Sequence, residues 1–334
     1  MNRFEIVPFD EELVADASRL LAQRHRRDRA TLPDLPAGFE TPAAAAAAVS
    51  ATLELAGTTG VAAVRDSQLL GYMMGRPTID ALWGRSAWVR PAGCATDPEE
   101  THDLVRSLYA ALATPWVEQG IFFHFALMPL ADRALLDALY SLSYGIEQVQ
   151  ALQSLASVDP APPNVPAGVE IRRAGPDDKD ALRAMSSVIW RQHISPPVWA
   201  IMLPEQVSEQ EDGWADLVDE EGVTVFLAFV DGQIAGSQGY WPAEVGADDM
   251  LTPRGSASMS VAGTLPRFRG RGISTALSRT VLAAARAEGY TIMETDWRSA
   301  NLLAANFWQN QGYRPVAYRL VRRIDQRIAW AKGR

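Results

Sequence analysis

The stretch "PRFRGRGISTALSR", Pro266–Arg279, contains two glycines and four arginines, and both glycines and three of the arginines lie directly before an apolar repeat. Apolar residues recur at helical spacing over 273–288, and Gly289 follows as a stop signal, so this segment predicts a helix. The start of a helix leaves about four backbone N–H groups without intrahelical partners and carries a partial positive charge. Gly270 and Gly272 let the backbone approach a ligand closely. The stretch therefore predicts an anion site.

The side chains of this loop suit a ligand that carries several phosphates. Arg267, Arg269 and Arg271 add long-range attraction, and the hydroxyl of Ser274 can cap the helix or donate to the anion. A nucleoside-triphosphate loop would require Gly-Lys-Ser/Thr, which is absent. A dinucleotide fingerprint would require a glycine where Thr275 stands. A bound polyphosphate of another kind is the hypothesis that remains.

The composition is that of a globular protein with a small-molecule ligand. The chain has 334 residues, 48% hydrophobic and 21% charged, with a formal net charge of -9. This length accommodates two ordinary domains. Because the charge repels a phosphate backbone, we expect no nucleic-acid partner, whereas a cationic amine substrate is compatible with it.

Targeting and metal signals are absent from the sequence pattern. No apolar stretch reaches the roughly 18 to 20 residues of a membrane span, and charges interrupt the first twelve residues, so we expect a cytoplasmic protein without a membrane partner. Cys94 is the single cysteine, and the four histidines show no metal-ligand spacing. We expect no metal site, and Cys94 is interpreted as a loop or core thiol rather than a nucleophile.

The sequence indicates two related halves joined by a proline-rich linker. "RDSQLLGYMMGRP" from Arg65 and "VDGQIAGSQGYWP" from Val230 match without gaps at four positions, each pair 165 positions apart. The segment 157–168 has the composition of a semi-rigid, extended linker. The predicted organisation is a first domain at 1–156, the linker at 157–168, and a second domain at 169–334.

Each half predicts strands and helices in alternation. In the second half, Asp231-Gly232 between two apolar runs is a strong hairpin signal. The order of elements from Val169 onward is strand, helix, three strands, helix, strand, helix, strand. The predicted fold class is α/β, with an α+β mixed sheet, mostly antiparallel, flanked by helices in each half.

Two motifs in the second half resemble one known superfamily. The spacing Arg267-x-x-Gly270-x-Gly272, after a strand and before a helix, looks like the pyrophosphate-binding loop of the GNAT superfamily of acyl-CoA-dependent N-acetyltransferases. "NLLAANFWQNQGY", from Asn301, resembles that family's later signature behind the strand "TIMETDW". The resemblance runs from about Val169 to Arg322 and implies two tandem GNAT-like domains, the first of them a degenerate copy.

The resemblance implies acetyl-CoA as cosubstrate, held in a V-shaped opening between the two central parallel strands. By this analogy, backbone N–H groups around the loop bind the pyrophosphate, Leu265 lies near the pantetheine arm, and Asn301 contacts that arm. Asn301 is equally suited to cap a helix. The implied cofactor-binding residues are Leu265, Arg267, Phe268, Arg269, Gly270, Arg271, Gly272, Ile273, Ser274 and Asn301.

Acetyl transfer to an amine needs a base that keeps the nucleophile neutral. Side chains alternate along "METDW", so Glu294 and Asp296 share one face. Asp296 occupies the position where several peptide-acetylating relatives place a carboxylate base, and it is the first candidate. Glu244, Asp248 and Asp249 are alternatives that could also bind a cationic substrate, and His193 is another candidate base.

The family's usual proton donor to the leaving thiolate is a tyrosine at the position that Trp308 occupies here. An indole N–H donates a hydrogen bond but no proton near neutral pH. Three alternatives follow: water or Tyr313 protonates the thiolate, the thiolate leaves unassisted but hydrogen-bonded, or the domain is catalytically weak.

The acceptor side of the family corresponds to the segment after the first helix, so Trp199 and Trp214 are predicted to form a substrate wall, with Glu244 as a contact to the amine. The first half lacks the loop. Acidic residues crowd the corresponding helix start, where they repel phosphate. We therefore expect this half to support the fold or to wall the substrate cleft.

The resulting hypothesis is an N-acetyltransferase that moves an acetyl group from acetyl-CoA to a primary amine of a small molecule or peptide by direct attack. The alternatives are an acyl-CoA-binding sensor or interaction protein with weak catalysis, and an unrelated phosphate-metabolite binder. The expected oligomeric state is a monomer or a homodimer.

Overall fold

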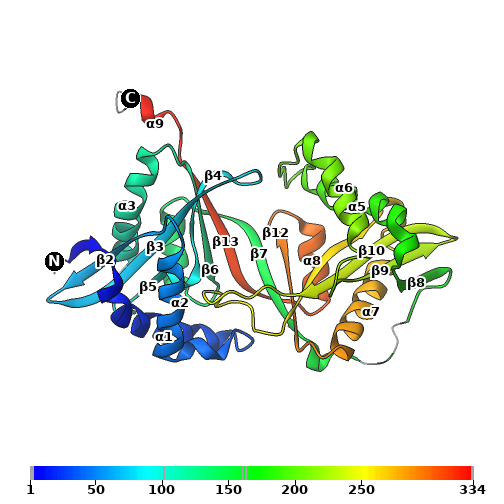
Figure 1. The fold of residues 1–334 in the computed structure, drawn as a ribbon, viewed down its shortest axis with the longest axis horizontal. Coiled ribbons are helices and arrows are strands. Elements are labelled where there is room, and N and C mark those ends of the chain that lie inside the picture. Colours follow the sequence, from blue (N-terminus) through cyan, green and yellow to red (C-terminus); the bar gives the residue numbers. More distant parts are fainter. Residues whose placement is uncertain (1–3, 101, 160, 162–163, 332–334) are drawn as a thin grey trace. The chain divides into compact units, whose positions relative to one another are not determined.

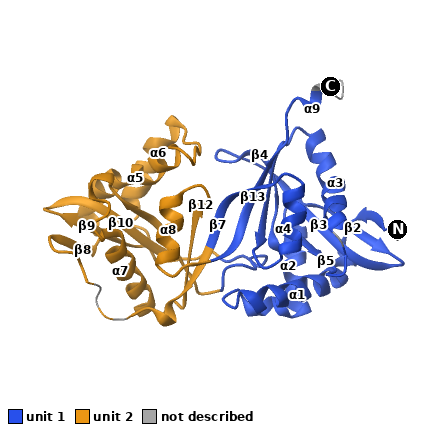
Figure 2. Cartoon of the chain, turned by 180° about the vertical axis from the view of Figure 1, so that it is seen from behind, with its two compact units in different colours: residues 1–150, 245–253, 315–334 blue, residues 151–244, 254–314 orange. Residues whose placement is uncertain are grey.

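The computed structural model describes residues 4–100, 102–159, 161 and 164–331. Figure 1 shows helices packed on sheet strands, and Figure 2 colours two compact units. Unit 1 comprises residues 1–150, 245–253 and 315–334, and unit 2 comprises 151–244 and 254–314. No helix in the described part of the chain is long and apolar enough to cross a membrane. The same residues contain no group of three or more potential metal-binding side chains.

The sheet of unit 1 is antiparallel except for one parallel pair. Its strand order is β1-β2-β3-β4-β6-β13, and β5 pairs with β3. β4 and β6 are parallel, with Ser86 opposite Phe123 and Val89 opposite Ala126. The strands are β1 (Glu5–Pro8), β2 (Thr59–Arg65), β3 (Gln68–Asp80), β4 (Gly84–Val89), β5 (Cys94–Thr96), β6 (Phe123–Pro129) and β13 (Arg314–Arg323).

Helices cover both faces of this sheet. Ala62, Tyr72 and Met74 pack in one apolar cluster with helices α1 and α2, whereas Ala63 and Met73 pack in another with α3 and α4. Side chains alternate between the faces of a strand, so a strand buried on both faces reads as the continuous apolar run seen in β3. The helices are α1 (Val14–Thr31), α2 (Pro42–Glu54), α3 (His102–Glu118), α4 (Arg133–Ser141) and α9 (Ile328–Ala331).

Unit 2 repeats this plan with the strand order β12-β11-β10-β9-β8. Only β11 and β12 are parallel, and the other pairs are antiparallel. The strands are β8 (Val169–Arg173), β9 (Thr224–Val230), β10 (Gln233–Pro242), β11 (Ala257–Thr264) and β12 (Ile292–Arg298). The predicted mixed, mostly antiparallel sheet flanked by helices is confirmed.

The helices of unit 2 also lie on two faces of the sheet (Figure 1). α5 and α6 pack on Val225, Leu227 and Val261, and α7 packs through Ile273 and Leu277 on Ala228 and Ala235. The helices are α5 (Lys179–His193), α6 (Val207–Asp216), α7 (Ile273–Ala287) and α8 (Leu302–Asn310).

The two halves of the chain carry the same series of helices and strands, apart from the additional strand β5 in the first half and the short helix α9 at the end of the second. β2 and β9 begin and end 165 positions apart, and β3 and β10 begin at that same offset. The two hairpin turns also agree: Asp231 and Gly232 have φ of 49° and 73°, and Asp66 and Ser67 have φ of 50° and 63°. Positive φ at both central residues is the geometry of a type I′ hairpin, as the Asp-Gly pair predicts.

The compact units do not coincide with the division at 157–168. The segments 245–253 and 315–334 belong to unit 1 although they come from the second half of the sequence. β13 pairs there with β6, for example Leu320 with Ala126. β7 (Gly145–Ser154) starts in unit 1, and its last four residues belong to unit 2. The division into 1–156 and 169–334 therefore describes the repeat in the sequence, and residues 160, 162 and 163 of the linker lie outside the described part.

Unit 1 buries several ionisable groups. Arg24 and Asp28 of α1 are each 1% exposed and form an ion pair of 3.3 Å, and Arg24 also donates to the carbonyl of Pro91 at 3.0 Å. Burial raises the pKa of Asp28 to about 6 despite that partner. Cys94 is fully buried, and burial raises the pKa of its thiol to about 12, so it is a core thiol without nucleophilic character at neutral pH.

His124 is buried as a neutral ring. Its Nε2 lies 3.0 Å from the carbonyl of Ile121, which accepts the N–H, so Nδ1 is left to accept from the hydroxyl of Tyr109 at 2.7 Å. Burial lowers the pKa of His124 to about 4. A histidine whose pKa is depressed in the folded state binds more protons when unfolded, so its contribution to stability is lost as pH falls from about 6.5 to about 4.

We expect His124→Gln to weaken the acid sensitivity of the fold. In the variant, the unfolded state takes up no proton at position 124. The free energy of unfolding should therefore fall by about 2 kcal/mol less between pH 7 and pH 5 than it does in the wild type. Urea unfolding at both pH values measures this difference. His102→Gln, at an exposed histidine of α3, is the matched control and should leave the loss unchanged. An equal loss in wild type and H124Q would contradict the prediction.

Candidate cofactor-binding and catalytic site

The two parallel strands of unit 2 separate soon after they meet. β11 and β12 pair only at Ala257 with Met293 and at Ser258 with Glu294. Beyond this point β11 carries a register irregularity against β10, next to Val261, which has a φ of 44°. Such a bulge bends a strand and disturbs its pairing. The separation of the parallel strands is the feature that the sequence resemblance led us to expect.

The corresponding parallel pair of unit 1 stays together. β4 and β6 are paired at four successive positions, up to the last residue of β4, Val89. The chain then turns through Pro91–Gly93 and pairs β5 with β3 before α3 begins. Glu100, near the start of α3, forms an ion pair of 2.8 Å with Arg65. A carboxylate and a closed strand pair thus occupy the region that in unit 2 contains the loop.

The loop before α7 presents a row of backbone N–H groups. Within the described chain, the N–H groups of residues 270–275 have no backbone acceptor. Gly270 and Gly272 have φ of 76° and 77°, a left-handed conformation in which residues with a Cβ are strained. Gly272 is the N-cap of α7 and supplies no side-chain cap, whereas Asn301 caps α8 through its side chain. The start of α7 is therefore left open to an anion.

Buried side chains hold this loop in position. Phe268 is 8% exposed and packs in one cluster with Ile273 and Leu277, which fixes the loop to the sheet at its start and end. Thr264, the last residue of β11, accepts at its carbonyl from Nε of Arg269 at 3.2 Å, and its hydroxyl lies 2.7 Å from that of Ser274. Ser274 therefore bonds to the strand rather than capping the helix. The sequence reasoning missed Thr264, whose only signal is its place at the end of the strand.

The arginines of the loop differ in their surroundings. Arg269 donates from Nη1 to Oε1 of Gln192 at 3.3 Å, and it is thereby tied to α5. The guanidinium groups of Arg267 and Arg271 lie 4.8 Å and 5.5 Å from the ring centre of Phe268. No carboxylate of the described residues forms an ion pair with Arg267 or Arg271, so their charge is available to a ligand.

Leu265 packs mainly into the fold. Its backbone N–H donates to the carbonyl of Ala235 at 2.9 Å, and its side chain contacts the apolar clusters on both faces of the sheet. This contact sets the position at which the chain leaves β11 and enters the loop.

The carboxylates of β12 lie as the alternation predicts. Met293, Thr295 and Trp297 are buried, whereas Glu294 is half-buried and Asp296 is exposed. Glu294 and Asp296 therefore share the face opposite to the buried residues. This arrangement leaves both as candidate bases.

The residues of the second motif pack closely at α8. The Oδ1 of Asn301 accepts from the N–H of Ala304 at 3.3 Å, so this residue is a helix cap and only its amide NH₂ remains to donate elsewhere. Trp308 is 6% exposed, with its ring 5.1 Å from that of Tyr313. The hydroxyl of Tyr313 is buried without a hydrogen-bond partner in the described chain, and burial raises its pKa. Tyr313 is accordingly a poor acid.

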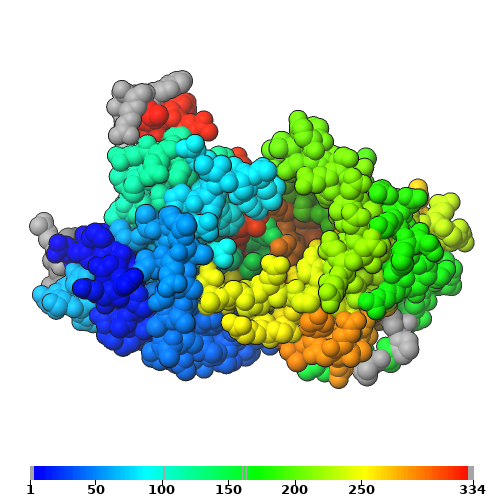
Figure 3. Space-filling view, in the orientation of Figure 1, coloured from blue at the N-terminus to red at the C-terminus, as the bar shows by residue number. Residues whose placement is uncertain are grey.

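The predicted substrate residues separate into two groups. Trp199, in the loop between α5 and α6, is 71% exposed, and Glu244 is exposed after β10. Trp214 is 8% exposed and packs with Leu182 and Leu227, so the prediction that it forms a substrate wall is wrong: α6 turns this side chain into the core. Figure 3 shows the α5–α6 segment as an outer surface, in green.

The other candidate bases are two carboxylates that hold the fold and one histidine. Asp248 lies 3.5 Å from Arg90, and Oδ1 of Asp249 accepts from the N–H groups of Leu251 and Thr252 in a turn of unit 1. Burial lowers the pKa of His193, and the charge of Arg298 lowers it further. A neutral His193 remains a candidate base, whereas Asp248 and Asp249 have structural roles.

The comparisons with known proteins agree with this geometry. The model of the acetyltransferase (GNAT) family matches residues 186–313, which include the separated strands, the loop and α8. No curated protein sequence matches the chain.

Solved structures match the chain over almost its full length. A GCN5-related N-acetyltransferase from Sphaerobacter thermophilus has 17% identity and a TM-score of 0.59, over 97% of this chain and 96% of that chain. A tandem GNAT protein from the clavulanic acid biosynthesis pathway has 16% identity and a TM-score of 0.51, over 96% and 98%. The glucosamine N-acetyltransferase region of a fungal β-N-acetylglucosaminidase has 15% identity and a TM-score of 0.55, over 96% of this chain and 38% of that chain.

At these identities the solved structures establish the fold, which is that of tandem GNAT proteins. Within this fold, the segment at residues 186–313 matches the acetyltransferase (GNAT) family model.

Proposed function

We propose that unit 2 transfers an acetyl group from acetyl-CoA to a primary amine of a small molecule or peptide. The observation that carries the proposal is the run of backbone N–H groups at 270–275 that have no backbone acceptor, at the uncapped start of α7. Oriented N–H groups at a helix start bind phosphate, and the diphosphate of coenzyme A has the matching charge. Arg267 and Arg271 add positive charge beside them.

The chemistry proposed is direct attack by the amine. The nitrogen lone pair forms the new C–N bond at the thioester carbon, the C–S bond breaks, and the thiolate of coenzyme A leaves. A base accepts the proton from nitrogen, and water returns a proton to the thiolate. Asp296 is the first candidate base because it is exposed, and Glu294 on the same face is the second.

Departure of the thiolate needs no acid from the protein in this proposal. A thiol with a pKa of about 8.5 or somewhat higher is a tolerable leaving group. Trp308 has no acidic proton near neutral pH, and Tyr313 is buried with a raised pKa. The same two residues support the alternative function, an acyl-CoA-binding sensor without turnover. Thiol release in the presence of a panel of primary amines distinguishes the two.

We expect the arginines of the loop to contribute to cofactor affinity. The double variant R267Q/R271Q should weaken acetyl-CoA binding about tenfold at low salt, with a smaller effect at high salt, because screening already reduces these attractions. Isothermal titration calorimetry at two salt concentrations measures the change. R279Q, on an exposed arginine two turns into the same helix, is the matched control and should bind as the wild type. Equal losses in the double variant and R279Q would contradict a phosphate site at the loop.

We expect Asp296→Asn to lower kcat at least a hundredfold for the best amine, because general-base catalysis typically contributes a factor of about 10² to 10⁴. The Kd of acetyl-CoA should stay unchanged, because Asp296 is assigned to the amine and not to the cofactor. Glu294→Gln is the matched variant on the same face and should retain most of the activity. If E294Q loses a hundredfold in kcat while D296N keeps its activity, the roles of the two residues are reversed.

We expect Trp308→Phe to keep kcat within about threefold of the wild type, because the indole supplies packing and no proton. Steady-state kinetics at pH 7 and 8 measures this, and a thermal melt checks the fold. A drop of more than tenfold with an unchanged melting temperature would show that the indole N–H stabilises the leaving thiolate.

A further inference from the structure

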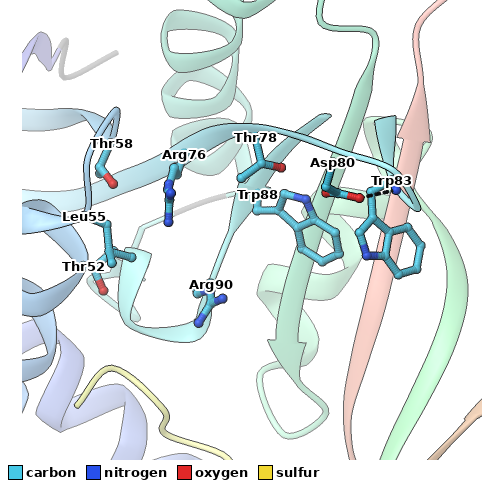
Figure 4. A pocket seen from close by; sticks show the side chains of 10 residues that line it. Thr52, Leu55, Thr58, Arg76, Thr78, Asp80, Trp83, Trp88 and Arg90 are labelled. Carbon is cyan, nitrogen blue, oxygen red and sulfur yellow. Dashed lines mark hydrogen bonds between the residues drawn. The ribbon is translucent and has the colours of Figure 1, made fainter. Parts of the chain in front are cut away.

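Unit 1 contains a cavity of about 260 Å³ that the chemistry proposed for unit 2 does not use. It is lined by the end of α2, by Thr58 in the following loop, and by residues of the β3–β4 hairpin. Figure 4 shows these side chains around the space. All of the lining residues belong to unit 1.

One face of the β3–β4 hairpin forms the polar wall of this cavity. Arg76 and Thr78 are two positions apart on β3 and therefore point to the same face. Arg76 lies directly opposite Trp88 of β4 in the antiparallel register, so the two side chains are neighbours on that face. The register thus places a guanidinium beside an indole.

The cavity contains donors without partners. Nε of Arg76 and Oγ1 of Thr58 are buried and have no hydrogen-bond partner in the described chain. No carboxylate of the described residues forms an ion pair with Arg76, and the second arginine, Arg90, is 56% exposed and 3.5 Å from Asp248. Buried donors left unmatched are costly, so an acceptor that reaches them is stabilising. An anion with two oxygens matches the guanidinium fork.

The only carboxylate of the lining is held in a turn. Oδ1 of Asp80 accepts from the N–H groups of Leu82 and Trp83 at 2.9 Å and 2.6 Å. These bonds hold the carboxylate at the turn end of the hairpin, four residues along β3 from Arg76. The part of the cavity next to Arg76 and Thr58 therefore remains positive.

Trp88 supplies an aromatic surface. One face of its ring is stacked on Phe125, with centroids 4.3 Å apart and planes at 16°. Its Nε1 donates to the hydroxyl of Ser86 at 3.0 Å, so its only polar atom is satisfied. Trp83 meets the same ring edge-on at 5.5 Å. The face away from Phe125 suits a flat apolar group, which rings prefer to contact by offset stacking or edge-to-face packing.

We infer that this cavity binds a small aromatic carboxylate. The carboxylate bonds to Arg76 and to the hydroxyl of Thr58, and the ring lies against Trp88. The cavity volume has room for roughly nine water-sized groups at about 30 Å³ each. Benzoate, with its ring and carboxylate, fits within that volume. The lining residues of the cavity all belong to unit 1, so the site uses none of the residues of the loop before α7.

Calorimetric titration of the full chain with benzoate tests this inference, with acetyl-CoA at saturating concentration in a parallel titration. Benzoate should bind with one site per chain, equally well in both titrations. Benzamide, which lacks the charge, and cyclohexanecarboxylate, which lacks the flat ring, should each bind at least fivefold more weakly. Inorganic phosphate should bind more weakly than benzoate.

Substitutions then assign the site. R76Q should weaken benzoate binding at least tenfold, and R76K should recover only part of the affinity because lysine lacks the fork. R85Q is the matched control, since Arg85 is an exposed arginine of β4 outside the cavity lining. Thermal melts check that the variants are folded. T58V removes the hydroxyl that contacts the carboxylate and should weaken benzoate binding about threefold.

Several results would overturn the inference. The first two are the absence of heat with benzoate up to about 10 millimolar and equal binding of benzamide and benzoate. The next two are competition between benzoate and acetyl-CoA and equal losses of affinity in R76Q and R85Q. Phosphate binding as tightly as benzoate would likewise replace it with a general anion site.

Discussion

The site depends on one backbone constraint, the left-handed conformation of Gly270 and Gly272 before α7. An L-residue with a Cβ costs about 1 to 2 kcal/mol in this conformation. Neither glycine faces a severe steric limit: an added Cβ at Gly270 meets nothing within 4 Å, and one at Gly272 comes to 3.4 Å from Pro166. The backbone conformation is therefore what selects glycine, and it leaves the N–H groups of 270–275 without backbone acceptors.

The rest of unit 2 holds this loop beside the separated strands. Phe268 and Ile273 anchor it in the apolar cluster under α7, Thr264 bonds to Arg269 and Ser274, and the irregularity at Val261 accompanies the end of parallel pairing. The corresponding part of unit 1 follows a similar order, with β5 added before α3, and lacks these features: its parallel strands stay paired, and Glu100 lies near the start of α3. The two copies of the fold thus differ in their parallel strands and in the segment that leads into the following helix.

Local signals in the sequence predicted the features that depend on local geometry. The turn at Asp231, the glycine pair at 270 and 272, and the alternation of Glu294 and Asp296 follow from backbone preferences over a few residues. Features that arise from distant packing were not predicted. These include the burial of Trp214, the pairing of β13 with β6 in unit 1, and the meeting of Arg76 with Trp88, which depends on the register of two strands.

Hydrogen–deuterium exchange with and without coenzyme A tests the central claim most directly, because it reports on individual backbone amides. If the N–H groups at the start of α7 hold the diphosphate, peptides covering residues 266–276 should exchange more slowly with the ligand bound. Peptides covering the start of α3 in unit 1 should be unaffected. Saturating coenzyme A that leaves exchange at 266–276 unchanged, or that slows it at the start of α3 instead, would contradict the account.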